Sequence, residues 1–231
     1  KAKNFSSALT SFQKAHELAT AAGDEATQKR SAKNGGVAAY MHGVQESKAD
    51  KAQAALAAFD AGIALAPTFY ANYIGRASAL KDAGDVETAM QAYIKAAEVS
   101  QRAGKMDKRN EMYEQAEGFS ARAIAAEDWN QAIEYGNMYL ALNPESSDVE
   151  YHLAVAYSNL GNDASALEHA DKAIALSKGS RSTKAPYFMI KAESLENMQR
   201  FEEAVAAYRE ANVGQYAARA AYKIETLGGT Q

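Results

Sequence analysis

The sequence predicts an all-α fold, and three features of its composition support this prediction. Its 231 residues include 52 alanines, the strongest helix former, but only three prolines, which break helices. Leu, Ile, Val and Phe together number only 36, so β-branched residues are too few for a β-sandwich or barrel. This scarcity does not indicate disorder, because the net charge is only −4 and Tyr and Met add apolar content. We therefore expect helices that pack through small side chains.

The composition also disfavours several classes of function. No run of apolar residues is long enough for a transmembrane helix. The absence of cysteine excludes disulfides, cysteine nucleophiles and thiolate metal sites. Because 25 basic residues are balanced by 29 acidic ones, we expect no nucleic-acid partner and no direct membrane insertion.

One pattern recurs along the chain: a turn, an alanine, a residue that is often aromatic four positions later, and a residue that is usually small seven positions later. The anchoring alanines are Ala8, Ala55, Ala89, Ala132, Ala166 and Ala204. Small residues stand twelve positions before the last five anchors, at Gly43, Ala77, Ser120, Ala154 and Ala192. Steps of four and seven lie on one helical face, so these residues predict closely packed pairs of helices.

This pattern resembles the tetratricopeptide repeat, a 34-residue helix–turn–helix unit. In that family a small residue lies late in the first helix, Ala, an aromatic residue and Ala lie on the second, and a proline often closes the repeat. Pro67 and Pro144 stand at that closing position, and Leu160-Gly161 resembles the turn between the helices. The resemblance implies a right-handed α-solenoid of stacked antiparallel helix pairs.

The repeat register predicts one solenoid domain over residues 1–231. Its expected elements, in order, are a half-repeat at 1–22, repeats at 36–69, 70–103, 113–146, 147–180 and 185–214, and a capping helix at 215–227. The insertions at 22–35 and 102–110 predict longer helices, with Gly23 and Gly104 just past helix ends. A loop is expected at 178–185, with Pro186 opening the next helix. The leading half-repeat makes us expect further sequence before it.

We find no pattern that indicates catalysis, a metal or a cofactor. The histidines His16, His42, His152 and His169 fall on different predicted helices and match no metal-ligand spacing. Gly35-Gly36 belongs to no phosphate-loop motif. We therefore expect a protein that is not an enzyme and holds no cofactor and no metal.

The resemblance implies that the first helix of each repeat lines an inner, concave surface. Counting back fifteen, eleven and eight residues from the anchoring alanines gives the candidate groove residues Tyr40, Val44, Ile74, Ser78, Lys81, Tyr151, Val155 and Met189. Tyrosine and aliphatic side chains suit contact with a peptide or helix. Each of these residues has the alternative of packing against neighbouring helices. The same count places acids at Glu117, Glu193 and Glu196.

Chaperone-binding members of the family carry a clamp of Lys, Asn and Arg for an acidic C-terminal peptide. Here those positions hold Tyr40, Val44, Ile74, Ser78 and Glu117, with only Lys81 basic, so such a clamp is not expected.

The leading hypothesis is a protein–protein interaction scaffold whose groove holds a peptide or helix of an unidentified partner protein. The alternatives are a structural spacer or a segment that self-associates through the open half-repeat, and a sensor of a peptide signal supported by the long insertions. The composition and the start at Lys also resemble exported bacterial repeat proteins, so we expect a periplasmic or other extracytoplasmic location.

Overall fold

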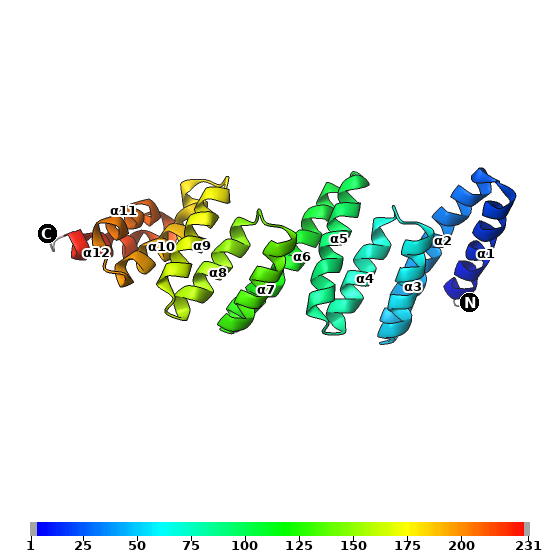
Figure 1. Ribbon diagram of the computed structural model, residues 1–231, viewed down its shortest axis with the longest axis horizontal. Coiled ribbons are helices and arrows are strands. Elements are labelled where there is room, and N and C mark those ends of the chain that lie inside the picture. Colours follow the sequence, from blue (N-terminus) through cyan, green and yellow to red (C-terminus); the bar gives the residue numbers. More distant parts are fainter. Residues whose placement is uncertain (1–3, 229–231) are drawn as a thin grey trace. The chain divides into compact units, whose positions relative to one another are not determined.

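A computed structural model describes residues 4–228, which form twelve α-helices and one short 3-10 helix (Figure 1). No residue in this part of the chain lies in a strand, so the predicted all-α fold is confirmed. The elements are α1 (Phe5–Ala22), α2 (Glu25–Ser47), α3 (Ala52–Leu65), α4 (Tyr70–Asp82), α5 (Val86–Arg102), α6 (Met106–Ala125), α7 (Trp129–Leu142), α8 (Ser147–Asn159), α9 (Asp163–Leu176), α10 (Arg181–Asn197), α11 (Phe201–Ala211), η1 (Gly214–Tyr216) and α12 (Ala217–Gly228).

The helices belong to two compact units that divide within α6, one reaching to Ala116 and the other starting at Glu117. In the first unit, each helix from α1 to α4 packs against the next, and α2 also contacts α4. In the second unit, α7 to α11 pack in the same consecutive way, and α10 also contacts α8 and α9. Each unit is therefore a stack of helix pairs. The single solenoid domain expected from the repeats remains a prediction.

The repeat register is confirmed by burial. The anchors Ala55, Ala89, Ala132, Ala166 and Ala204 are completely buried. All five small residues that precede these anchors by twelve positions are buried too. The alanines therefore mark the close contacts between the two helices of each pair, as the spacing predicts.

Phe59 shows how small residues and one aromatic ring fill a repeat. Its ring is buried between α2 and α4, where a Cβ added to Gly43 or Gly75 would lie 2.5 or 2.3 Å from a ring carbon. The two glycines leave the space that the ring occupies, so the helices approach closely without a cavity.

Both long insertions extend helices, as predicted. The first insertion lengthens α2 to 23 residues, and the second lengthens α6 to 20. Gly23 and Gly104 end the preceding helices with φ of 69° and 70°, a left-handed conformation that glycine adopts without strain. Asp24 then caps α2 by accepting a hydrogen bond from the Thr27 amide at 3.0 Å. The predicted repeat at 36–69 placed Gly35-Gly36 near the start of a helix. Because α2 begins at Glu25, these glycines lie in its middle instead.

The prediction that Pro186 opens a helix is wrong. Helix α10 begins five residues earlier, at Arg181, and Pro186 lies inside it. Ser180 caps this start by accepting from the Thr183 amide at 3.3 Å, and the Arg181 side chain donates to the carbonyl oxygens of Arg209 and Glu210. These contacts fix the start of the helix, and its second turn tolerates the proline.

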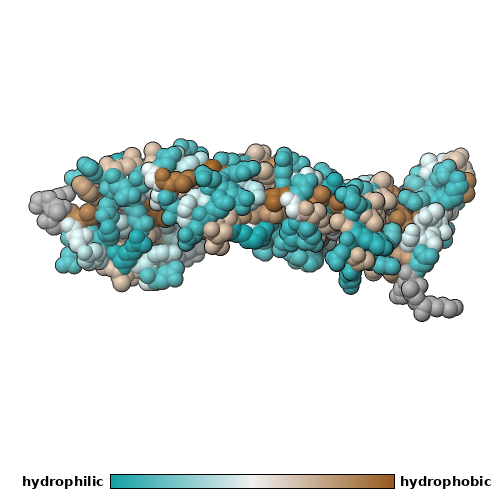
Figure 2. Space-filling model, turned by 90° about the horizontal axis from the view of Figure 1, so that it is seen from below, coloured by the Kyte–Doolittle hydropathy of each residue, from teal (hydrophilic) through white to brown (hydrophobic). Residues whose placement is uncertain are grey.

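Among the described residues, no helix is both long and apolar enough to cross a membrane. Figure 2 shows one face of the molecule, on which hydrophilic side chains predominate and apolar residues are exposed in small, separate patches.

Candidate functional site

In the first unit, the candidate groove residues Tyr40 and Val44 lie on α2, and Ile74, Ser78 and Lys81 lie on the neighbouring α4. All five are partly exposed. Since α2 and α4 are in contact, the structure brings these side chains onto adjacent helices of one unit.

Tyr40 is both a core residue and a surface residue. Its ring centroid lies 6.2 Å from that of Phe59 and 6.4 Å from that of Phe69, in the tilted and edge-on arrangements that aromatic pairs prefer. Val44 packs against the same cluster of Ala55, Phe59 and Ala79. Part of the Tyr40 side chain and part of the Val44 side chain therefore pack in the core of the repeat, and the remainder of each faces outward.

Lys81 is already engaged within the first unit. Its Nζ atom donates a hydrogen bond to Gln115 Oε1 at 3.4 Å and lies 5.9 Å from the centroid of the Tyr93 ring. These two contacts hold the side chain of Lys81, the only basic candidate, at the polar edge of the candidate groove.

In the second unit, Tyr151 and Val155 lie on α8 and are also partly exposed. The Tyr151 ring centroid is 5.1 Å from that of Tyr187 on α10. Burial raises the pKa of Tyr151 to about 12, with smaller contributions from Tyr216 and Glu193. Tyr151 therefore remains a neutral hydrogen-bonding group at physiological pH.

Met189 is not a groove residue. Only 3% of it is exposed, and it belongs to a core cluster with Ala192, Leu195 and Tyr208. Counting back from Ala204 placed it inward, but α10 is covered by α8, α9, α11 and η1, which leave less of its surface free.

The acids expected on the inner face of α10 are paired by the last helix. Lys223 of α12 lies 2.6 Å from Glu196 Oε1, and the Tyr208 hydroxyl donates to Glu196 Oε2 at 2.6 Å. Arg219 lies 2.9 Å from Glu193 Oε1. The repeat count placed both acids on the inner face of the first helix, and the structure pairs each of them with a cation of α12.

Burial and pairing shift the pKa values of these two acids in different directions. Burial raises the pKa of Glu193, and the nearby Arg219 and Lys223 only partly offset it. Burial also acts to raise the pKa of Glu196, but the hydrogen bonds from Lys223 and Tyr208 outweigh it, so this pKa is lowered. Glu196 therefore contributes its ionised form to the contact between α10 and α12.

Each histidine has a partner within the protein. Nδ1 of His16 lies 3.1 Å from the Gln28 carbonyl oxygen, and Nδ1 of His42 lies 3.7 Å from a Glu46 oxygen.

The other two histidines are in the second unit. His152 pairs with Ser120 Oγ at 2.9 Å, and His169 pairs with the buried Glu150 at 2.6 Å. Across residues 4–228, no three His, Asp or Glu side chains gather as a metal-ligand set.

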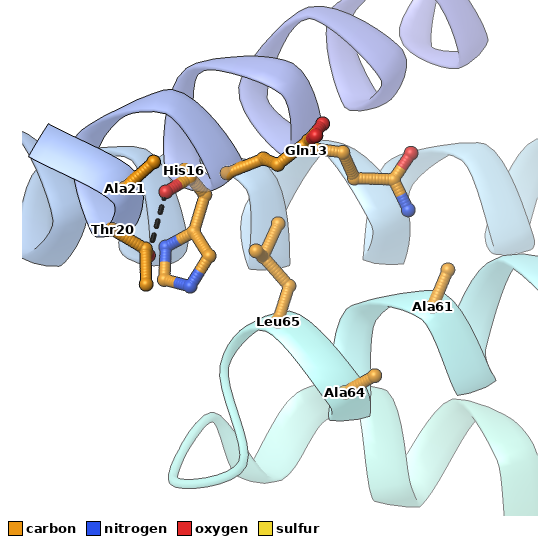
Figure 3. A pocket seen from close by; sticks show the side chains of 8 residues that line it. Gln13, His16, Thr20, Ala21, Ala61, Ala64 and Leu65 are labelled. Atoms are coloured by element: carbon orange, nitrogen blue, oxygen red, sulfur yellow. Dashed lines mark hydrogen bonds between the residues drawn. The ribbon is translucent and has the colours of Figure 1, made fainter.

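A separate groove of about 550 Å³ opens between α1 and α3 (Figure 3). In Figure 3, His16 and Thr20 of α1 face Leu65, Ala61 and Ala64 of α3. The small alanines leave the space, and the lining is mainly apolar. This groove lies between second helices, away from the inward positions, so the repeat register does not predict it.

The most exposed apolar side chains of α2 lie outside the set of candidate groove residues. Val37 and Met41 are 40% and 42% exposed, more than any candidate that we counted from the anchors. The steps from Val37 to Met41 and Val44 are four and three residues, which place all three on one helical face. That spacing was readable in the sequence, but the count from Ala55 skipped the first two positions.

The fold and these surfaces define a helix-pair repeat protein. Residues 151–179 and 185–212 match the family model described as tetratricopeptide repeat, and these segments cover most of the pairs α8–α9 and α10–α11. These two helix pairs are tetratricopeptide repeats.

Several solved structures are similar to this chain. The Arabidopsis OM64 TPR domain is 20% identical with a TM-score of 0.46, and the match covers 52% of this chain and 98% of that one. The P58(IPK) TPR domain is 16% identical with a TM-score of 0.44, covering 96% and 64%. YrrB, described as a TPR protein with an unusual peptide-binding site, is 15% identical with a TM-score of 0.40, covering 76% and 84%. A comparison with curated proteins gave no match.

Proposed function

We propose that this protein is a non-catalytic interaction scaffold that binds a peptide or helix of another protein through the inward faces of its first helices. The observation that carries the proposal is a repeated one. Tyr40 and Val44 on α2 occupy the same positions, fifteen and eleven residues before an anchoring alanine, as Tyr151 and Val155 on α8. All four are partly exposed, so the same pair of side chains is accessible on a first helix of each unit.

Partly exposed tyrosine beside valine suits protein recognition. The tyrosine ring offers a large contact area with a polar tip and loses little conformational entropy when it binds. In both units a neighbouring ring holds this tyrosine, Phe59 beside Tyr40 and Tyr187 beside Tyr151, so the surface is preorganised.

Photo-crosslinking of the full chain tests this proposal. A photoreactive phenylalanine analogue replaces Val44 or Val155, and in matched control variants it replaces Leu142 or Leu18, which are exposed on second helices. We expect the two inward positions to crosslink the same partner and the two control positions to give none. Crosslinking only from Leu142 or Leu18 would move the binding surface to the other face.

Self-association is a second candidate, favoured by one observation on α1. Leu18 is 57% exposed on the half-repeat whose other side borders the groove between α1 and α3. Light scattering of the wild type and of Leu18→Lys over a range of concentrations tests it. A mass that rises with concentration in the wild type alone would support self-association, and a constant monomer mass would exclude it.

A further inference from the structure

Helix α2 carries a continuous exposed stripe that extends beyond the candidate groove. Its members are Arg30, Lys33, Val37, Met41, Val44 and Lys48, separated by steps of three or four residues. Such steps keep residues on one face, so the stripe follows the helix axis for about 27 Å. Five of the six side chains are exposed, and Val44 is partly exposed.

The chemistry of this stripe changes along its length. Its centre is apolar, formed by Val37, Met41 and Val44, while Arg30 and Lys33 occupy one end and Lys48 the other. No charged residue on the stripe is acidic, although the chain as a whole carries a net charge of −4. The stripe is therefore a local region of positive charge on an acidic protein.

The carboxylates of α2 do not neutralise these cations. Glu25 pairs with Lys29 at 3.0 Å, and Glu46 pairs with Lys51 at 3.6 Å. Within the part of the chain that the structure describes, Arg30, Lys33 and Lys48 form no ion pair with a carboxylate. Arg30 also interacts electrostatically with Asp24 at the start of α2, so Lys33 and Lys48 are the cations most available to acidic groups from outside the chain.

The linear arrangement favours a helical partner over an extended one. An extended segment laid on Val37, Met41 and Val44 would find no hydrogen-bonding partners there for its backbone N–H and C=O groups. A helix satisfies its own backbone, and an apolar stripe of its own would pack along this one.

We propose that the α2 stripe docks an amphipathic helix of a partner protein, with apolar residues in its middle turns and acidic residues on the same face at both ends. This inference rests on the proposed scaffold function and specifies the partner's chemistry. The apolar centre supplies contact area, and the cations at the two ends fix position and exclude partners with basic ends.

Two synthetic helical peptides of equal length and apolar content test the proposal. One carries glutamates in its first and last turns on the apolar face, and the other carries lysines at the same positions. Binding of each labelled peptide to the full chain is measured by fluorescence anisotropy. We expect the glutamate peptide to bind about tenfold more tightly than the lysine peptide.

Two double variants locate the site on α2. Lys33→Glu/Lys48→Glu should reverse the preference between the peptides, whereas Val37→Ser/Met41→Ser should weaken binding of the glutamate peptide about tenfold. The matched control Lys105→Glu/Lys178→Glu makes the same charge change at exposed positions off α2 and should change neither affinity. Circular dichroism confirms that each variant remains helical.

Equal affinity of the two peptides, no binding of either, or an equal effect of the control variant would overturn the proposal. None of these variants alters Tyr40 or Val44. A partner that still crosslinks at Val44 while any of these results is obtained would therefore leave the scaffold function standing and reject only the partner chemistry proposed for α2.

Discussion

Phe59 illustrates how this chain forms a core with few large apolar residues. Its ring occupies the space left by Gly43 and Gly75, and the anchoring Ala55 packs in the same cluster. Close approach of backbones, rather than a large number of branched side chains, supplies the packing contacts. The small residues at the repeat positions are consequently needed for their size, and not only for their helix propensity.

Replacing either glycine beside Phe59 with alanine should destabilise the protein. Alanine favours a helix over glycine by about 1 kcal/mol, but the added Cβ would overlap the Phe59 ring, and overpacking costs about 1–3 kcal/mol. We expect Gly43→Ala and Gly75→Ala each to lower the free energy of unfolding, measured by urea denaturation followed by circular dichroism.

The matched control is Gly118→Ala in α6. There an added Cβ would meet only the flexible end of Arg122, at 3.0 Å. This variant should gain up to about 1 kcal/mol from helix propensity. If all three glycine variants were stabilised alike, close packing around Phe59 would not be the reason for the glycines.

His152 links stability to pH at the residue scale. Burial lowers its pKa below the usual 6.5, with a smaller opposing effect of Asp148. The unfolded chain therefore binds a proton at His152 at a higher pH than the folded chain does. The contribution of neutral His152 to stability is present above pH 6.5 and is lost as the pH falls through the lowered pKa of the folded state.

We expect His152→Gln to reduce the loss of unfolding free energy between about pH 7 and about pH 5. Urea titrations at both pH values measure this, with His16→Gln as the control. An unchanged pH dependence in His152→Gln would show that another group is responsible.

At the scale of elements, α12 is attached to α10 by charge as well as by apolar contact. Ala220, Ile224 and Leu227 pack on the core cluster, while Lys223 and Arg219 approach Glu196 and Glu193. The lowered pKa of Glu196 means that its ionised form is favoured in the folded state. Its contribution to stability is present above the ordinary value of 4.5 and is lost as the pH falls through the folded value.

The two acids should respond differently to neutralisation at pH 7. Glu196→Gln removes a favourable charge and should lower the free energy of unfolding by about 1 kcal/mol. Glu193→Gln removes a charge that burial disfavours, and should cost less or stabilise. Hydrogen exchange of α12 amides measures the docking of this helix directly. Faster exchange in Glu193→Gln than in Glu196→Gln would contradict this assignment.

The elements that the sequence predicts well are those set by local chemistry. The left-handed glycines at Gly23 and Gly104 end helices where the spacing places them, and the anchoring alanines occur at their predicted contacts. The start of α10 was misplaced because the prediction gave more weight to Pro186 than to the local cap Ser180, and because the contact between Arg181 and the end of α11 joins residues far apart in sequence.

The candidate site was predicted only in part for the same reason. Tyr40, Val44, Tyr151 and Val155 are partly exposed as the register suggests, because their positions depend on one helix and its immediate neighbours. Met189 and the pairing of Glu196 depend on how α11 and α12 cover α10, which the repeat spacing alone does not determine.

At the scale of the whole molecule, the division within α6 raises the question of cooperativity. Repeat proteins unfold cooperatively when the interfaces between neighbouring repeats are strong. The single tryptophan, Trp129, lies in the second unit, whereas Gly43 lies in the first. Trp129 fluorescence therefore reports on one unit when the other is perturbed.

If residues 1–231 form the single domain that the repeats predict, Gly43→Ala should lower the urea midpoint seen by Trp129 fluorescence as much as the midpoint seen by circular dichroism. A fluorescence midpoint that stays at the wild-type value would show instead that the two units unfold independently.

The central claim is that the inward faces of the first helices bind a partner protein, and hydrogen–deuterium exchange of the full chain with and without its crosslinked partner tests it most directly. We predict slower exchange in the partner-bound state for amides of α2 and α8, around Tyr40–Val44 and Tyr151–Val155, with no change in α3 and α9. Protection confined to α3 and α9, with α2 and α8 unchanged, would contradict the claim.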